Sequence, residues 1–139
     1  MPKAWMWLRI ASVVNGLFAV GHGLGHVRTI EGSLPGETVL SAMKTFHFNA
    51  MGSDRTYWDF FTGYSLMVVV IAVLLAVVLW QLGSLAKSHG LEIRSLVWTL
   101  TGAQVAITII AFTNFFAAPA IGNTLASVCL AMAAFSSKS

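Results

Sequence analysis

The chain has 139 residues, of which 57% are hydrophobic and 9% are charged, and its mean hydropathy is +0.78. Because a soluble globular domain carries roughly 25% charged residues, this composition indicates that lipid surrounds most of the chain. The net charge is +3, but the eight Lys and Arg residues are scattered over the predicted loops, which is typical of topology signals and argues against nucleic-acid binding. The single cysteine, Cys129, excludes a disulfide framework within one chain.

Four apolar stretches are long enough to cross a bilayer as helices, since a span needs about 20 residues. Trp5 and Trp7 precede most of the first stretch and are typical interfacial anchors. Residues 83–94, between the second and third stretches, are predicted to form a loop. The predicted spans cover residues 6–27, 57–82, 95–116 and 118–136.

A shorter helix is predicted between the first two spans, over residues 37–51. Apolar residues such as Leu40 and Met43 recur there at three- and four-residue spacing, with polar residues on the other side. The segment is too short and too polar to span, so we expect it to lie on the membrane surface or to cap the bundle. His47 falls on its apolar side and is therefore expected to face the protein.

These elements predict an all-α protein: a polytopic membrane four-helix bundle of one domain, residues 1–139, with a short amphipathic cap helix between spans 1 and 2. Four spans place both termini on one side of the membrane. Basic residues near span ends mark the cytoplasmic side. Five lie on the side of the termini, Lys3, Arg9, Lys87, Arg94 and Lys138, and three lie on the other side, Arg28, Lys44 and Arg55. Both termini are therefore predicted to be cytoplasmic.

Polar side chains inside the first span indicate a candidate site. His22 and His26 are four residues apart, hence on one helix face, and the Asn15 amide lies seven residues before His22. Ionisable groups in an apolar span are costly, so function is the default hypothesis for them. The predicted topology brings both histidines, His47 and Asp59 toward one pocket in the outer leaflet.

The first functional hypothesis is that this pocket binds a lipophilic small molecule. A neutral imidazole beside a carboxylate titrates near neutrality, which suits acid-base chemistry such as double-bond isomerisation. The candidate catalytic residues are His22, His47 and Asp59. The candidate ligand-binding residues are Asn15, His26, Tyr57, Trp58, Phe61 and Tyr64.

The alternative hypothesis is a zinc or iron site, because three imidazoles and one carboxylate are a ligand set that these metals take. Its ligands would be His22, His26, His47 and Asp59. A haem would need axial histidines from two facing helices, which this pattern supplies poorly. We therefore favour no cofactor.

Structural roles can also explain these residues. The histidines, Asn15 and Gln104 are of the kind that hydrogen-bond neighbouring membrane helices, and Asp59 suits the positive end of a helix dipole. The aromatic residues would form an interfacial belt. Glycine-rich first and fourth spans would allow close packing against another copy or a larger membrane complex, which makes an accessory subunit a third class of function.

The run from Ser41 to Tyr64, with Gly21-His22 upstream, resembles a family of small uncharacterised four-helix bacterial membrane proteins. The resemblance rests on a Met43-Lys44-x-x-His47 pattern ahead of the Gly52-Ser53 turn and an aromatic-rich span. It implies a bacterial inner-membrane location and a four-span fold. It implies no particular activity.

Overall fold

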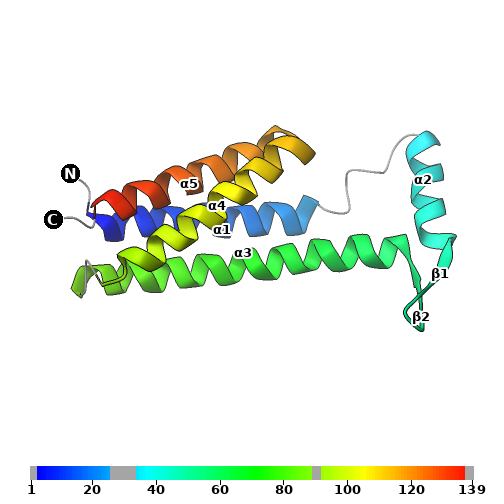
Figure 1. Cartoon of the computed structure of the whole chain (residues 1–139). Coiled ribbons are helices and arrows are strands. Elements are labelled where there is room, and N and C mark those ends of the chain that lie inside the picture. Colours follow the sequence, from blue (N-terminus) through cyan, green and yellow to red (C-terminus); the bar gives the residue numbers. More distant parts are fainter. Residues whose placement is uncertain (1–2, 26–33, 89–91, 137–139) are drawn as a thin grey trace. The chain divides into compact units, whose positions relative to one another are not determined.

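The computed structural model describes residues 3–25, 34–88 and 92–136 (Figure 1). The described elements, in chain order, are α1 (Ala4–Gly25), α2 (Leu34–Thr45), β1 (His47–Ala50), β2 (Ser53–Thr56), α3 (Tyr57–Ser88), α4 (Arg94–Asn114) and α5 (Ala117–Ser136). Helices α1, α3, α4 and α5 are each long and apolar enough to cross a membrane. The predicted all-α membrane bundle with four spans is confirmed.

The chain forms two compact units. The first, which we call the bundle unit, comprises Met1–Phe18 and Ala72–Ser139, and the second, the head unit, comprises Ala19–Ile71. Helices α1 and α3 contribute to both units. The bundle unit also contains α4 and α5, whereas the head unit contains α2 and the two strands.

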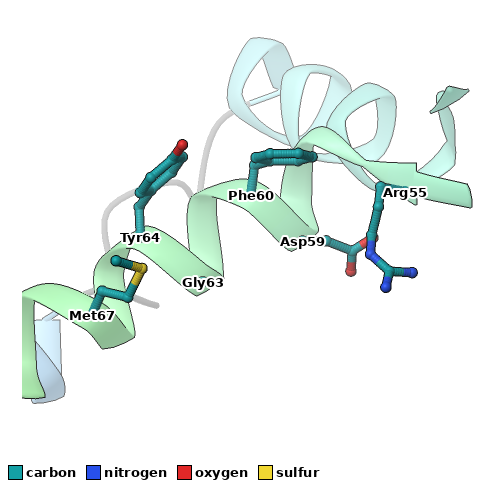
Figure 2. Close-up of a pocket in the computed structure, with 6 residues that line it drawn as sticks. All are labelled: Arg55, Asp59, Phe60, Gly63, Tyr64 and Met67. Atoms are coloured by element: carbon teal, nitrogen blue, oxygen red, sulfur yellow. The ribbon is translucent and has the colours of Figure 1, made fainter. Parts of the chain in front are cut away.

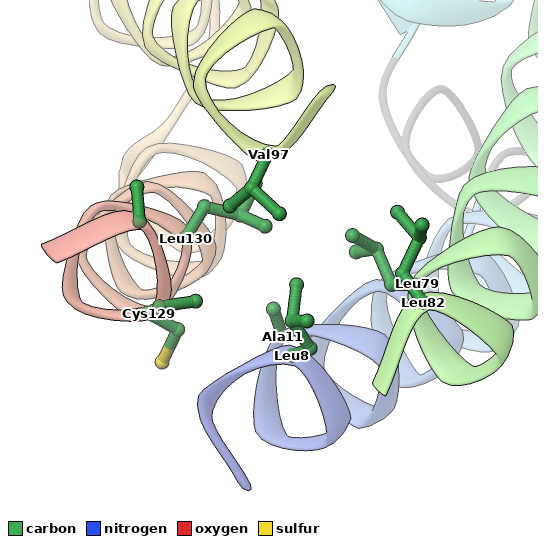
Figure 3. Close-up of a cluster of buried hydrophobic side chains, with 9 residues drawn as sticks. Leu8, Ala11, Leu79, Leu82, Val97, Cys129 and Leu130 are labelled. Carbon is green, nitrogen blue, oxygen red and sulfur yellow. The ribbon is translucent and has the colours of Figure 1, made fainter. Parts of the chain in front are cut away.

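All four long helices contribute to the core of the bundle unit (Figure 3). Leu8 of α1, Leu79 of α3 and Leu130 of α5 are completely buried, and Val97 of α4 is nearly so. The rest of the core is made mostly of small residues, above all the alanines of α5, which allow the helices to approach closely. The outward faces of the spans remain apolar, as a lipid environment requires: Leu17 is 68% exposed and Val70 is 66% exposed.

Polar side chains join α4 to α5. Nε2 of Gln104 donates to Oδ1 of Asn123 at 2.8 Å, and Nδ2 of Asn123 donates to the carbonyl oxygen of Pro119 at 2.8 Å. One turn further along, the hydroxyls of Thr108 and Ser127 lie 2.9 Å apart. The interhelical role predicted for Gln104 is confirmed. Asn15 differs, because its Nδ2 donates to the Ala11 carbonyl of its own helix at 2.9 Å.

Helix α3 is longer than predicted, since residues 83–88 continue it instead of opening a loop. Gly83 explains the difference. A Cβ atom there would lie 3.3 Å from the backbone oxygen of Trp5 and 3.2 Å from Cγ of Arg9. The glycine therefore serves close packing of α1 against α3, and the polar residues after it occupy the final helical turns.

Basic and aromatic side chains cluster where α1 begins and α3 ends. The Arg9 guanidinium lies 4.5 Å from the ring centroid of Trp80, and Nζ of Lys87 lies 4.5 Å from that of Trp5. Such cation–π pairs are typical of the membrane–water interface, where tryptophan and basic side chains meet.

The predicted helix over residues 37–51 is only partly correct, because α2 ends at Thr45 and a β-hairpin follows. The antiparallel strands pair His47 with Thr56 and Ala50 with Ser53, leaving a two-residue turn of Met51 and Gly52. Both turn residues have positive φ, 52° and 92°, as a type I′ hairpin turn requires. The turn and the packing of Phe48 on α3 stabilise the hairpin. Residues 47–50 are therefore a strand, although the spacing of the apolar residues predicted a helix.

Candidate functional site

Helix α3 begins with a reciprocal pair of hydrogen bonds. Oδ2 of Asp59 accepts from the backbone N–H of Thr56 at 2.8 Å and from its hydroxyl at 3.0 Å. The Thr56 hydroxyl oxygen in turn accepts from the backbone N–H of Asp59 at 3.2 Å. This is a capping box, which satisfies two backbone donors that the helix would otherwise leave unpaired. The predicted catalytic carboxylate therefore has a structural role at the start of the helix.

His47 lies on the hairpin instead of on an inward-facing helix side. Its Nδ1 is 3.0 Å from Oδ2 of Asp54 on the facing strand, and the side chains are 58% and 74% exposed. The expectation that His47 faces the protein was wrong, because residues 47–50 form a strand with this side chain on its exposed surface.

His22 makes a contact between helices. Its Nε2 lies 3.1 Å from Oγ of Ser65 on α3, within the head unit. Asn15 belongs to the bundle unit, where it is buried and bonded to its own helix. His26, the remaining predicted site residue of α1, lies outside the described residues.

The metal hypothesis finds no support in residues 3–25, 34–88 and 92–136. That part of the chain contains no group of three or more His, Cys, Asp or Glu side chains placed to hold a metal ion. One of the four proposed ligands, His26, lies outside it. A zinc or iron site therefore stays a prediction from the sequence alone.

An aromatic stack connects the hairpin to the start of α3. Phe48 of β1 is central: its ring centroid lies 4.9 Å from that of Tyr57 and 5.7 Å from that of Phe60. Phe46 extends the stack beyond Tyr57, at 6.0 Å, and Tyr64 extends it beyond Phe60, at 6.2 Å. Stacked and tilted rings at these separations stabilise a fold beyond simple area burial. They hold the hairpin on α3.

Trp58 and Phe61 belong to a second aromatic contact. Their ring centroids are 5.4 Å apart, and Nζ of Lys44 on α2 lies 4.9 Å from the Trp58 ring centroid. Both residues, like Tyr57, are predicted ligand-binding residues, and that role stays a prediction. The Lys44 contact joins α2 to α3, whereas the contact between Trp58 and Phe61 lies within α3.

An open groove follows one side of α3, and we call it the α3 groove (Figure 2). Its volume is about 300 Å³. Figure 2 shows two charged residues at one end and an aromatic ring and a thioether at the other, with a glycine between them. The lining residues are Arg55, Asp59, Phe60, Gly63, Tyr64 and Met67. Of these, only Asp59 and Tyr64 were among the predicted site residues.

Gly63 contributes backbone alone to the lining of the groove. A Cβ atom placed there would find no other atom within 4 Å, so a larger side chain would project into open space. Figure 2 shows Gly63 between Asp59 and Tyr64 along the helix. The lining residues of α3 recur at three- and four-residue spacing, which is the signal for one helix face. That spacing alone does not show which face of α3 remains free of packing against other elements.

A second cavity of about 270 Å³ lies at the turn between α4 and α5. It contains no ionisable side chain among its six lining residues. They are Phe112, Phe115, Phe116, Ala117, Ala120 and Ile121. A cavity of this composition offers apolar contact only, so the α3 groove is the better candidate for selective binding.

Comparisons with protein-family models, curated proteins and solved structures give no match to this chain. Its function must therefore be argued from the site. The α3 groove combines a guanidinium and a carboxylate with aromatic and apolar walls. A ligand site commonly has this character, with mainly apolar lining and a few polar groups that fix orientation.

Proposed function

We propose that this protein is an integral protein of a bacterial inner membrane and binds a lipophilic small molecule in the α3 groove. The observation that carries the proposal is the change in polarity along the groove. Arg55 lies on β2 just before α3, and Asp59 lies in the first turn of α3. The lining continues through Phe60 to Met67 in the apolar part of this helix. An amphiphile with a polar head and an apolar body matches this order.

The proposal is one of binding, without an acid-base step. The three ionisable residues suggested for catalysis each have a separate local contact: His22 with Ser65, His47 with Asp54, and Asp59 with Thr56. General acid-base catalysis needs a group within hydrogen-bond reach of the reacting atom, and only Asp59 of the three lines the groove. Assembly with another copy or a larger membrane complex stays a prediction from the glycine-rich spans.

The test compares two glycine-to-leucine variants purified in mild detergent. Gly63→Leu would fill the α3 groove, whereas Gly102→Leu makes the same change on α4, where a Cβ atom also meets open space. Mass spectrometry of organic extracts should find a lipophilic molecule with the parent and with Gly102→Leu, and much less with Gly63→Leu. Equal amounts in all three proteins, or none in the parent after incubation with membrane lipid extract, would contradict the proposal.

We also propose that both termini are cytoplasmic. The basic-aromatic cluster formed by Arg9, Lys87, Trp5 and Trp80 supports this orientation, because cytoplasmic span ends are enriched in Lys and Arg. A green fluorescent protein fused after Ser139 should fluoresce in cells, and alkaline phosphatase inserted at Gly32 should be active. The predicted orientation would be reversed if phosphatase inserted at Gly32 were inactive and green fluorescent protein inserted there fluoresced.

A further inference from the structure

The two charged residues of the α3 groove are held separately. Nη1 of Arg55 donates to the backbone oxygen of Asp54 at 2.8 Å, and Oδ2 of Asp59 is bonded to Thr56. Among the described residues, His47 and Asp54 are a basic and an acidic side chain in contact, at 3.0 Å, and this contact includes neither groove residue. Arg55 and Asp59 thus present opposite charges that do not neutralise each other by direct contact.

Opposite fixed charges discriminate between headgroups. A guanidinium binds phosphate through charge-assisted hydrogen bonds, while a carboxylate binds an ammonium group. A headgroup with net negative charge would be attracted by Arg55 and repelled by Asp59. A headgroup with net positive charge would be attracted by Asp59 and repelled by Arg55. A headgroup that carries both phosphate and ammonium can satisfy both residues.

The rest of the groove has the composition to receive the first part of an acyl chain. Asp59 and Met67 are about 12 Å apart along α3, at 1.5 Å of rise per residue. Between them the lining consists of Phe60, Gly63 and Tyr64, and beyond Met67 the helix contains no charged residue until Lys87. A chain lying on this surface would therefore run from the polar end of α3 toward the middle of the span.

We infer that the α3 groove selects a zwitterionic, amine-bearing phospholipid. Its headgroup lies across the neighbouring side chains of Arg55 and Asp59, with the phosphate at the guanidinium and the terminal ammonium at the carboxylate, and one acyl chain leaves the phosphate side along α3 toward Gly63. This inference rests on the proposed function and names its ligand class. The ligand comes from the surrounding bilayer.

The test is a competition between two lipids measured on the full chain by native mass spectrometry. Phosphatidylethanolamine and phosphatidylglycerol with identical acyl chains are added in equal amounts to delipidated protein. The parent should prefer phosphatidylethanolamine by about tenfold, the size expected from one charge-assisted hydrogen bond. Equal binding of the two lipids, or a preference for phosphatidylglycerol, would overturn the inference.

Charge-removing variants make the test specific. Asp59→Asn keeps an oxygen acceptor for the capping box but removes the negative charge, so the preference should shift toward phosphatidylglycerol. The matched control Asp54→Asn makes the same charge change on the hairpin, outside the groove, and should keep the parental preference. An unchanged preference in Asp59→Asn would contradict the inference.

Arg55→Gln provides a second variant at an exposed position, in case Asp59→Asn does not fold. It should weaken the binding of both lipids, because the phosphate loses its guanidinium, whereas Lys44→Gln should not. Gly63→Leu separates the two proposals. If Gly63→Leu reduces lipid binding while the parent shows no headgroup preference, the α3 groove is the binding site but does not select a zwitterionic headgroup. If Gly63→Leu binds both lipids like the parent, the groove itself is not the site.

Discussion

Nε2 of His22 and Oγ of Ser65 lie 3.1 Å apart and join α1 to α3 in the head unit. Ser65 is buried, and one residue beyond His22 a Cβ atom on Gly23 would lie 3.7 Å from Cγ2 of Val69. The histidine is therefore part of a close helix–helix contact. Glycine beside an interhelical hydrogen bond is a common way to hold membrane helices together, which favours a structural role for this imidazole.

Ser65→Ala should lower the free energy of unfolding by about 0.6 kcal/mol, the average for interhelical hydrogen bonds in membrane proteins. Reversible unfolding in mixed micelles can measure this change. Ser84→Ala is the control, because the Ser84 hydroxyl is exposed and its bond goes to Trp80 of its own helix. The interhelical role would be disproved if both variants lost the same stability, or if Ser65→Ala and His22→Leu showed no coupling in a double-mutant cycle.

The contact between Gln104 and Asn123 predicts unequal effects from its two sides. Gln104 is 2% exposed, and in the described structure its Oε1 atom has no hydrogen-bond partner. Asn123→Ala would leave the Gln104 amide nitrogen without its partner as well, so we expect a loss of about 1 to 2 kcal/mol. Gln104→Leu removes the unpaired Oε1 atom of Gln104, but it leaves Oδ1 of Asn123 without its donor. We therefore expect it to lower the free energy of unfolding clearly less than Asn123→Ala does.

The double variant Gln104→Leu, Asn123→Ala is the critical measurement for this pair. It removes every buried polar atom of the contact, so it should be more stable than Asn123→Ala alone. Micelle unfolding of all three variants gives the comparison. Strictly additive losses would show that the two side chains act independently.

The spans could be predicted from sequence because each needs only a long apolar run, which no local detail overrides. Their ends were less predictable. Gly83 looked like the start of a loop, yet its role depends on how closely α1 approaches, as shown by the 3.3 Å separation from the Trp5 oxygen. A single glycine signals a turn or a close contact equally well until the neighbouring helix is known.

The candidate site was harder to predict. Asp59 and Tyr64 could be predicted as site residues because one is ionisable and the other aromatic, and both line the groove. Gly63 and Met67 carry no such chemical signal, since their contribution depends on which face of α3 remains unpacked. His47 was misplaced because the spacing of Leu40 and Met43 suggested that the helix continues, whereas the hairpin is stabilised by ring contacts distant in sequence.

Gly83→Ala should lower the stability of the protein, whereas Gly102→Ala should not. In an exposed helix position, alanine is favoured over glycine by roughly 0.5 to 1 kcal/mol, so Gly102→Ala should be neutral or stabilising. At position 83 the new Cβ would press against the Trp5 backbone oxygen, which cannot rotate away as the Arg9 side chain can. Gly83→Ala should therefore unfold more easily in micelles, and an equal gain in both variants would contradict the tight packing of α1 on α3.

The hairpin turn gives the sharpest contrast between the predicted helix and the observed strands. Met51 has φ of +52° and Gly52 has φ of +92°, and Oδ1 of Asn49 accepts from the Gly52 N–H at 2.6 Å. Residues with a Cβ are strained at positive φ by about 1 to 2 kcal/mol, and asparagine is the best tolerated after glycine. Met51→Asn should therefore stabilise the turn and Gly52→Ala should destabilise it. In a helix the signs would be reversed, because methionine and alanine are the better helix formers.

Hydrogen–deuterium exchange of a peptide covering residues 47–56 measures both effects on the full chain. A change of about 1 kcal/mol corresponds to roughly fivefold in the opening equilibrium, so exchange should slow by that factor in Met51→Asn and accelerate by it in Gly52→Ala. Peptides from α5 belong to the bundle unit and should exchange at the parental rate in both variants. Faster exchange in Met51→Asn together with slower exchange in Gly52→Ala would restore the helix to residues 46–51. It would also remove β1, on which Phe48 packs against Phe60, and with it the pairing partner of β2, whose Arg55 lines the α3 groove.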